Sequence, residues 1–244
     1  MNSGWNFQFT ELTKASAYPS LTQRIEVDKL LRVFLQQLPK QLKNIKILDI
    51  GCGDGNITKL IASSNPNSNV LGIDISEPFI KQAVSSEQFE NLEFRKMNFY
   101  AMDEIPDKSV DIATSIYSFY VQQLSDIRSL CHQIAKKIKV GGEIKFLLNT
   151  IAAKKGCQLP SSVLDGDRMF PITLNDGKGK IFNFEKFGLL ENEVVQGLLD
   201  VGFGDIRVQR LECSEKIGTG YVYRDLMAVI DVIIDARLGA NELS

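Results

Sequence analysis

Hydrophobic residues follow two patterns along the chain, and each pattern predicts a different kind of element. Short apolar runs bounded by turn residues, such as 110–116, predict strands that are buried on both faces of a sheet. Apolar residues at three- and four-residue spacing, as in 123–138, predict helices that pack on that sheet. The expected strands are 46–50, 70–75, 92–97, 110–116, 144–148 and 206–211. The expected helices are a first one that begins after Ser20 and ends near Pro39, followed by 55–64, 77–87, 123–138 and 191–200.

Strands and helices alternate as far as residue 150, which predicts a doubly wound α/β fold with a parallel sheet and helices on both faces. Two later segments depart from this alternation. The segment at about 150–185 mixes glycine and proline with aromatic residues, and we expect a long irregular insertion that covers a functional site. The run 229–234 fits a strand and also one face of a helix, and we favour the strand.

Composition narrows the class of protein. A chain of 244 residues with 44% hydrophobic content suits a single domain over 1–244, in which residues 1–39 form an N-terminal arm and helix. The net charge of −2 and the absence of a dense Lys/Arg block disfavour an obligate nucleic-acid partner. The four cysteines lack metal-site spacing, so we expect no metal and no disulfide framework. The sequence shows no signal peptide and no apolar stretch long enough to cross a membrane, which predicts a cytoplasmic protein.

The stretch 47–55, ILDIGCGDG, is an apolar strand that runs into a turn containing Gly51, Gly53 and Gly55. A second apolar run follows about one helix later and ends in Asp74, which completes the pattern of a nucleoside-binding βαβ unit. Asn56 stands where a dinucleotide-binding motif would have its last glycine. The turn also carries two carboxylates, at 49 and 54, which would repel a pyrophosphate but favour a cationic ligand.

The segments ILDIGCGDG and VLGIDIS together resemble the first two motifs of the Rossmann-like S-adenosylmethionine-dependent methyltransferases. The resemblance is specific over about 40–150 and loose over 190–238. It implies a mostly parallel seven-stranded sheet whose C-terminal strand inserts antiparallel between the strands at 144–148 and 206–211. It also implies S-adenosylmethionine as methyl donor and S-adenosylhomocysteine as product, and it implies no metal.

The resemblance assigns roles to individual residues near the turn. The three glycines would let the backbone approach the donor, Asp49 would reach its ammonium group, and Asp74 would accept both ribose hydroxyls. Ile75, Asn98 and Phe99 would lie against the adenine, although Asn98 replaces the usual aspartate. Cys52 would touch the donor as a small filler rather than act as a nucleophile. The expected cofactor-binding residues are Asp49, Gly51, Cys52, Gly53, Gly55, Asp74, Ile75, Asn98, Phe99 and Tyr117.

Methyl transfer from a sulfonium is an in-line displacement, so the protein can act mainly by alignment and desolvation. Tyr18, Tyr117 and Tyr120 are the candidates for positioning an acceptor, whereas His132 lies mid-helix and is expected at the surface. We therefore expect a methyltransferase, monomeric or homodimeric, that acts on a small organic acceptor. A module that binds the donor without transferring a methyl group, a protein or RNA methyltransferase, and an NAD-type oxidoreductase remain the alternatives.

Overall fold

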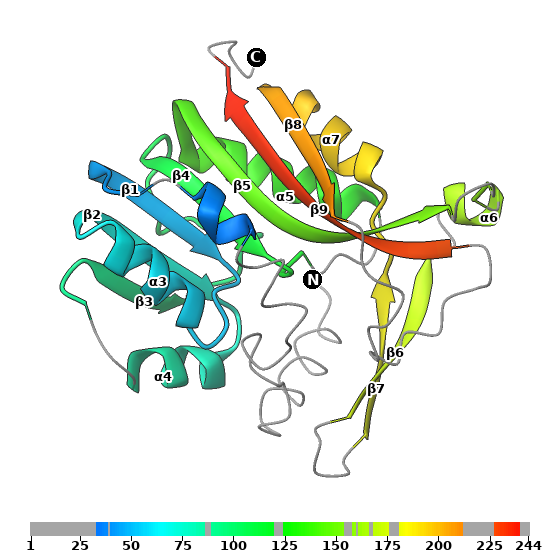
Figure 1. The fold of residues 1–244 in the computed structure, drawn as a ribbon, viewed down its shortest axis with the longest axis horizontal. Coiled ribbons are helices and arrows are strands. Elements are labelled where there is room, and N and C mark those ends of the chain that lie inside the picture. Colours follow the sequence, from blue (N-terminus) through cyan, green and yellow to red (C-terminus); the bar gives the residue numbers. More distant parts are fainter. Residues whose placement is uncertain are drawn as a thin grey trace.

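The computed structural model describes a seven-stranded sheet in the order β3-β2-β1-β4-β5-β9-β8 (Figure 1). The strands are β1 (Lys43–Ile50), β2 (Asn67–Asp74), β3 (Leu92–Lys96), β4 (Val110–Ile116), β5 (Ile138–Ala153), β8 (Phe203–Leu211) and β9 (Met227–Leu238). The residues that the structure describes are 33–38, 40–85, 89–119, 124–153, 158–159, 161–165, 168–175, 181–211 and 227–239.

The sheet has the predicted topology. The strands β1 to β5 pair in parallel, whereas β9 pairs antiparallel with both β5 and β8. The prediction of a C-terminal strand inserted between two earlier strands is therefore confirmed, and the ambiguous run 229–234 lies within β9. In β1 the first half is mostly exposed and the last four residues are buried, so the sequence is most apolar where the strand approaches the carboxyl edge of the sheet.

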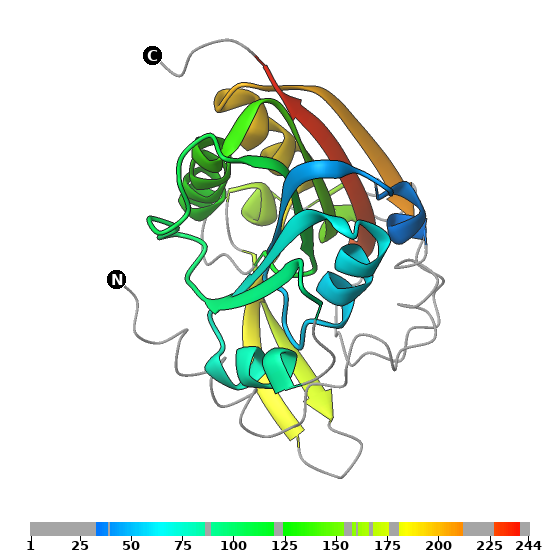
Figure 2. The same cartoon turned by 90° about the vertical axis from the view of Figure 1, so that its left-hand side faces the viewer.

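Helices cover both faces of the sheet, as the alternating pattern predicts. The labelled helices are α3 (Asn56–Ser64), α4 (Glu77–Ser85), α5 (Leu124–Lys137), α6 (Ser161–Leu164) and α7 (Glu191–Asp200), and residues 33–37 are also helical. Figure 2 shows α5 and α7 on one side of the sheet, with α3 and the helix 33–37 on the other. A large apolar cluster lies beneath α5 and α7, and a smaller one, which includes Phe34 and Ile61, lies beneath α3 and the helix 33–37.

Two glycines lie inside a strand that is longer than predicted. The strand was expected at 144–148, but β5 begins at Ile138, directly after α5, and contains Gly141 and Gly142. The pair forms an irregularity inside β5, where the register with β4 shifts between Val110 and Ile112. Gly141 has a φ of +78°, and a Cβ on Gly142 would lie 2.8 Å from the carbonyl oxygen of Asp111. The glycines therefore allow the bulge rather than end the helix.

The segment 150–185 is more ordered than expected. Besides the end of β5 and α6, it contains most of an antiparallel hairpin of β6 (Met169–Asn175) and β7 (Ile181–Phe187), which extends away from the main sheet in Figure 1. The prediction of an irregular segment is wrong for these residues. Pro171 obscures the strand pattern, and a two-stranded hairpin tolerates proline because each of its strands has a free edge.

Part of the predicted N-terminal region lies outside the described residues. The structure gives the end of the first helix at 33–37, and residues 1–32 are not among those described. Among the helices that are described, none is long and apolar enough to cross a membrane.

Candidate functional site

The turn between β1 and α3 contains three glycines in the left-handed region of backbone space. Their φ angles are +72° at Gly51, +55° at Gly53 and +78° at Gly55. A Cβ on Gly51 would lie 2.2 Å from the Cβ of Ser118, and one on Gly55 would lie 2.6 Å from the Phe94 ring. A Cβ on Gly53 would meet no atom within 4 Å. The glycines at 51 and 55 therefore serve packing, whereas Gly53 borders open space at the carboxyl edge of the sheet.

Asp74, at the end of β2, holds this turn through its carboxylate. One oxygen accepts a hydrogen bond of 3.0 Å from the backbone N–H of Gly53, and the other accepts one of 2.8 Å from the N–H of Ser76. Burial raises the pKa of Asp74, and the two hydrogen bonds oppose that shift. The hydroxyl oxygen of Ser76 accepts from the N–H of Phe79 at 3.4 Å, so Ser76 caps α4. Asp74 is thus not needed as a cap.

Asp49 lies at the same edge but deeper in the protein. Its side chain is 3% exposed, and its two oxygens accept hydrogen bonds from the hydroxyls of Thr58 at 2.6 Å and Thr114 at 2.8 Å. Burial is the main cause that raises the pKa of this carboxyl, and the nearby Asp74 adds to the increase. Sequence reasoning pointed to Asp49 but missed both threonines, which lie on α3 and β4.

The hydrogen bond between Asp49 and Thr114 belongs to a row of polar side chains that crosses the sheet. In register, Asp49 of β1 lies beside Thr114 of β4, Thr114 beside Lys145 of β5, and Lys145 beside Asp235 of β9. The ammonium of Lys145 pairs with the Asp235 carboxylate at 2.6 Å. In the sequence this row appears as one threonine in the strand 110–116 and one lysine in the strand 144–148, and other polar residues in both strands make neither of them stand out.

Hydrogen bonds connect the end of β4 to the start of the glycine turn. The hydroxyls of Ser115 and Ser118 contact each other and both donate to the carbonyl oxygen of Ile50, at 3.1 and 2.8 Å. Between them, Tyr117 has a φ of +52°, and its N–H donates to the carbonyl of Leu147 at 2.8 Å. A left-handed conformation is uncommon for a bulky residue and costs about 1–3 kcal/mol. Such strain is typical of positions that the surrounding structure holds for a function.

Of the remaining aromatic candidates, the structure describes Phe99 but neither Tyr18 nor Tyr120, both of which lie outside the described residues. The half-buried Tyr117 packs against the smaller apolar cluster, and the half-buried Phe99 packs against the larger one. Of the three tyrosines proposed to position an acceptor, only Tyr117 lies within the described residues.

Two other predicted donor contacts, Ile75 and Asn98, follow the ends of β2 and β3. Asn98 is exposed, and its side-chain oxygen accepts from the N–H of Tyr100 at 3.0 Å. Ile75 follows β2 and is half-buried. Since an amide oxygen has two lone pairs, Asn98 keeps the capacity for one further hydrogen bond.

The candidate nucleophiles and bases do not point to covalent chemistry. Cys52 is buried in the turn, and burial raises the pKa of its thiol well above the ordinary value, so the thiol stays protonated at neutral pH. His132 is exposed on α5, as expected. Within the described residues, no group of three or more His, Cys, Asp or Glu side chains could hold a metal ion.

Raising the pH should destabilise the ligand-free protein through its two buried carboxyls. Because burial raises the folded-state pKa of Asp49 and Asp74, the unfolded chain binds fewer protons above the ordinary carboxyl pKa of about 4. The free energy of unfolding should therefore fall as the pH rises from that value toward the folded-state pKa values. We expect Asp49→Asn to reduce the slope of the free energy of unfolding against pH, measured by urea unfolding over a pH series. An equal slope in wild type and variant would contradict this account.

Comparison with known proteins identifies the family. A family model described as "Methyltransferase domain" matches residues 41–169, which is more than half of the chain. The chain belongs to this methyltransferase-domain family. The match contains the glycine turn, Asp49 and Asp74, and it ends at Met169, the first residue of the hairpin of β6 and β7.

Individual relatives are similar over part of their length. The 235L protein of Invertebrate iridescent virus 6, which carries a methyltransferase name, is 33% identical over 114 residues, covering 47% of this chain and 40% of the viral protein. The trans-aconitate 2-methyltransferase of Rhodopseudomonas palustris (strain BisB5) is 31% identical over 99 residues, covering 41% of this chain and 38% of that protein. The matches thus span about two fifths of these curated relatives.

Solved structures extend the comparison to the whole fold. The structure of DhpI in complex with SAH has a TM-score of 0.65 at 18% identity and covers 99% of this chain and 100% of that chain. At this identity the similarity shows the fold alone. The shared fold covers nearly the full length of the chain.

Proposed function

We propose that the protein transfers a methyl group from S-adenosylmethionine to a small organic acceptor. One observation carries the proposal, namely that the space beside Gly53 is open and adjoins the carboxylate of Asp74 at the carboxyl edge of the sheet. Nucleoside ligands bind at this edge in open α/β sheets. The buried acids Asp49 and Asp74 suit a donor that carries a sulfonium and an ammonium better than they suit a pyrophosphate.

We expect the described residues to hold the donor without rearrangement of the turn. Each oxygen of the Asp74 carboxylate accepts one backbone hydrogen bond and has capacity for a second, which suits the two ribose hydroxyls. Gly53 would allow close approach of the donor, and Ile75, Asn98 and Phe99 would surround the adenine. Asp49 would act on the charged end of the donor.

S-adenosylmethionine, when bound, supplies a methyl group on a sulfonium leaving group. The chain then contributes alignment of the acceptor and exclusion of water. The backbone of Tyr117 is fixed before a ligand binds. Its left-handed conformation is held by the hydrogen bond from its own N–H to Leu147 and by the hydrogen bond from the neighbouring Ser118 to Ile50. We include Tyr18 and Tyr120 as further acceptor-positioning residues, and the segments 1–39 and 150–185 as the cover of the acceptor site.

A donor-binding module without methyl transfer is the second candidate. The family match covers 41–169, which contains the proposed donor site but little of the proposed acceptor cover. The described residues also place no histidine beside the turn, since His132 is exposed on α5. A protein or RNA methyltransferase is a third candidate, which acceptor screening separates from the first.

Replacing Asp74 with alanine should weaken donor binding by at least about tenfold, which corresponds to loss of one or more hydrogen bonds to a charged group. Isothermal titration with S-adenosylmethionine and with S-adenosylhomocysteine measures the effect. Asp200→Ala is the control, because the Asp200 carboxylate is exposed on α7 and bonds to Gln196 of the same helix, outside the proposed donor site. We expect that control to bind within about threefold of wild type.

The outcomes of this titration separate the candidates. Absence of binding to either ligand by the wild type would overturn the proposed function. Binding without methyl transfer to any member of an acceptor panel of small acids, amines and phenols, or to protein or RNA, would favour the donor-binding module.

A further inference from the structure

Asp49 is a buried carboxyl whose direct partners are both neutral. The side chain is 3% exposed, and its two oxygens bond to the hydroxyls of Thr58 and Thr114. A buried carboxylate without a countercharge is costly, so such a group takes up a proton unless a cation arrives. The environment of Asp49 therefore determines its charge state.

The groups nearest to Asp49 on the turn and on β2 add negative charge or none. Asp74 lies on the neighbouring strand, Asp54 lies in the turn, and the thiol of Cys52 is protonated at neutral pH. Each of these would disfavour a negative charge on Asp49 or leave it unchanged.

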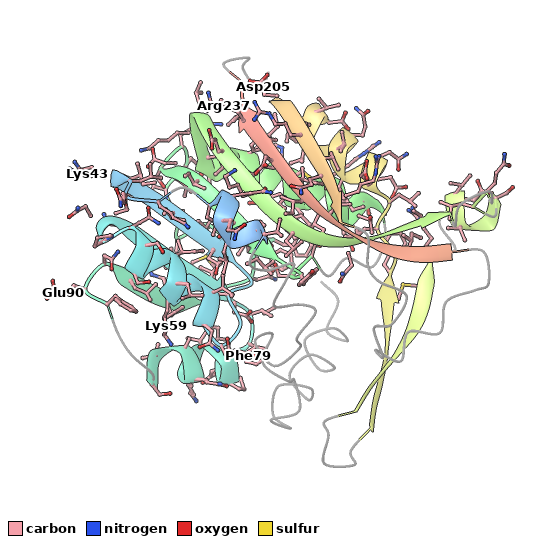
Figure 3. The ribbon with its side chains drawn as sticks, viewed as in Figure 1. Lys43, Lys59, Phe79, Glu90, Asp205 and Arg237 are labelled. Carbon is pink, nitrogen blue, oxygen red and sulfur yellow. The ribbon has the colours of Figure 1, made fainter. Side chains whose placement is uncertain are left out.

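The cations on the other elements around Asp49 have other partners. On α3, the ammonium of Lys59 lies 5.5 Å from the centre of the Phe94 ring, toward α4 and the β3 edge of the sheet (Figure 3). On β5, Lys145 is paired with Asp235. The helix 33–37, which covers the same face, has the sequence VFLQQ and carries no charge. Neither Lys59 nor Lys145 makes an ion pair with Asp49 in the described part of the chain.

Resting on the proposed function, we propose that Asp49 selects the donor by its charge: it is a neutral carboxylic acid in the free protein and releases its proton to solvent when the cationic donor binds. The donor carries one more positive charge than the product, because methyl transfer turns the sulfonium into a neutral thioether. An ionised Asp49 offsets that charge. After transfer the sulfonium charge is gone and only the ammonium group remains, so Asp49 is less favoured as a carboxylate and takes up a proton from solvent, which weakens the retention of the product.

The two threonine hydroxyls can form hydrogen bonds with Asp49 in both its ionised and its protonated state. A hydroxyl donates a hydrogen bond to an ionised carboxylate and can rotate to accept one from the protonated acid. Because their donated bonds favour the ionised form, they lower the pKa of Asp49 against the effect of burial. Thr58 and Thr114 are thus positioning residues, because their hydrogen bonds lower the pH at which Asp49 releases its proton.

The test is isothermal titration in buffers that differ in ionisation enthalpy, which counts the protons released on binding. We expect about one more proton released with S-adenosylmethionine than with S-adenosylhomocysteine at a pH below the midpoint of the transition. Since both ligands carry the same amino-acid group, the difference isolates the sulfonium. Below that midpoint, donor affinity should rise by up to about tenfold per pH unit, and above it the affinity should level off, while product affinity changes less.

Variants decide whether Asp49 is the source of the proton. Asp49→Asn should abolish the extra proton and reduce the preference for donor over product by about tenfold or more. Asp200→Asn, a control at an exposed carboxyl on α7 outside the proposed donor site, should keep both. Thr114→Val should retain the proton release but move the midpoint of the affinity profile to higher pH, an effect that a loss of packing alone would not produce.

Different titration results would overturn the proposed function and the role of Asp49. Wild-type protein that binds neither ligand would overturn both. Tight donor binding with no extra proton, or with the same proton in Asp49→Asn, would overturn the inference alone.

Discussion

Replacing Gly51 with alanine should lower the free energy of unfolding by about 2–4 kcal/mol. The φ of +72° is unfavourable for any residue with a Cβ, and the new Cβ would lie 2.2 Å from the Cβ of Ser118. Ser118 cannot easily move, because its hydroxyl is bonded to the carbonyl of Ile50. Urea denaturation of the purified variant measures the loss.

Gly53→Ala is the control that separates stability from binding. Its φ is +55° and no atom lies within 4 Å of the added Cβ, so the loss of stability should be only about 1–2 kcal/mol. The same Cβ would project into the space where we place the donor, so donor affinity should fall by about tenfold or more. Equal stabilities of the two variants would contradict the packing account, and unchanged donor affinity in Gly53→Ala would place the ligand elsewhere.

Replacing Glu193 with alanine should cost about 3–5 kcal/mol, because it leaves the Arg168 guanidinium buried without its countercharge. Arg168 is 1% exposed, and it bonds to Glu193 of α7 through two hydrogen bonds of 2.5 and 2.8 Å. The guanidinium also lies 4.8 Å from the centre of the Phe187 ring. Since Arg168 precedes β6 and Phe187 ends β7, this pair fixes the base of the hairpin to α7.

A second ion pair on α7 provides the matched control. Glu191 bonds to Arg210 with the same two-pronged geometry, at 2.7 Å for both hydrogen bonds, but Arg210 is 65% exposed. Glu191→Ala should therefore cost at most about 1 kcal/mol. The double variant Arg168→Met/Glu193→Leu should recover much of the loss in Glu193→Ala, since it removes both buried charges. Equal costs for the two single variants would show that burial does not govern the Arg168 pair. Thermal and urea unfolding give the required values.

The features that sequence analysis predicted depend on local pattern. The glycine turn and Asp74 lie within one βαβ unit, where strand, turn and helix follow each other along the chain, and each is visible in a few residues. The strand order also followed from the resemblance to a known family, including the position of β9 between β5 and β8.

The features that sequence analysis missed depend on contacts between distant segments. Thr114 bonds to Asp49 across 65 residues of sequence, and only the register of β1 and β4 brings the two together. Nothing in the sequence around Thr114 distinguishes it from any threonine in a strand. The bulge at Gly141-Gly142 likewise depends on the neighbouring strand, since it is the backbone of Asp111 that leaves no space for a Cβ.

The hairpin of β6 and β7 was missed for a different reason. Its strands pair mainly with each other, so their sequences lack the continuous apolar runs that identified the buried strands. The two side chains that fix its base, Arg168 and Glu193, are charged, and charged residues are ordinarily expected at the surface. Their pairing became visible only in three dimensions.

The position of β9 has a consequence for how the chain acquires its structure. β8 has β9 as its neighbour in the sheet, and β9 separates it from β5, so β8 cannot join the sheet until residues 227–238 are available. During synthesis from the N-terminus, the β3-β2-β1-β4-β5 part can assemble while the outer edge of β5 is still unpaired. An unpaired edge is prone to association with other chains. The nascent protein is therefore most vulnerable to aggregation after β5 has formed and before β9 is complete.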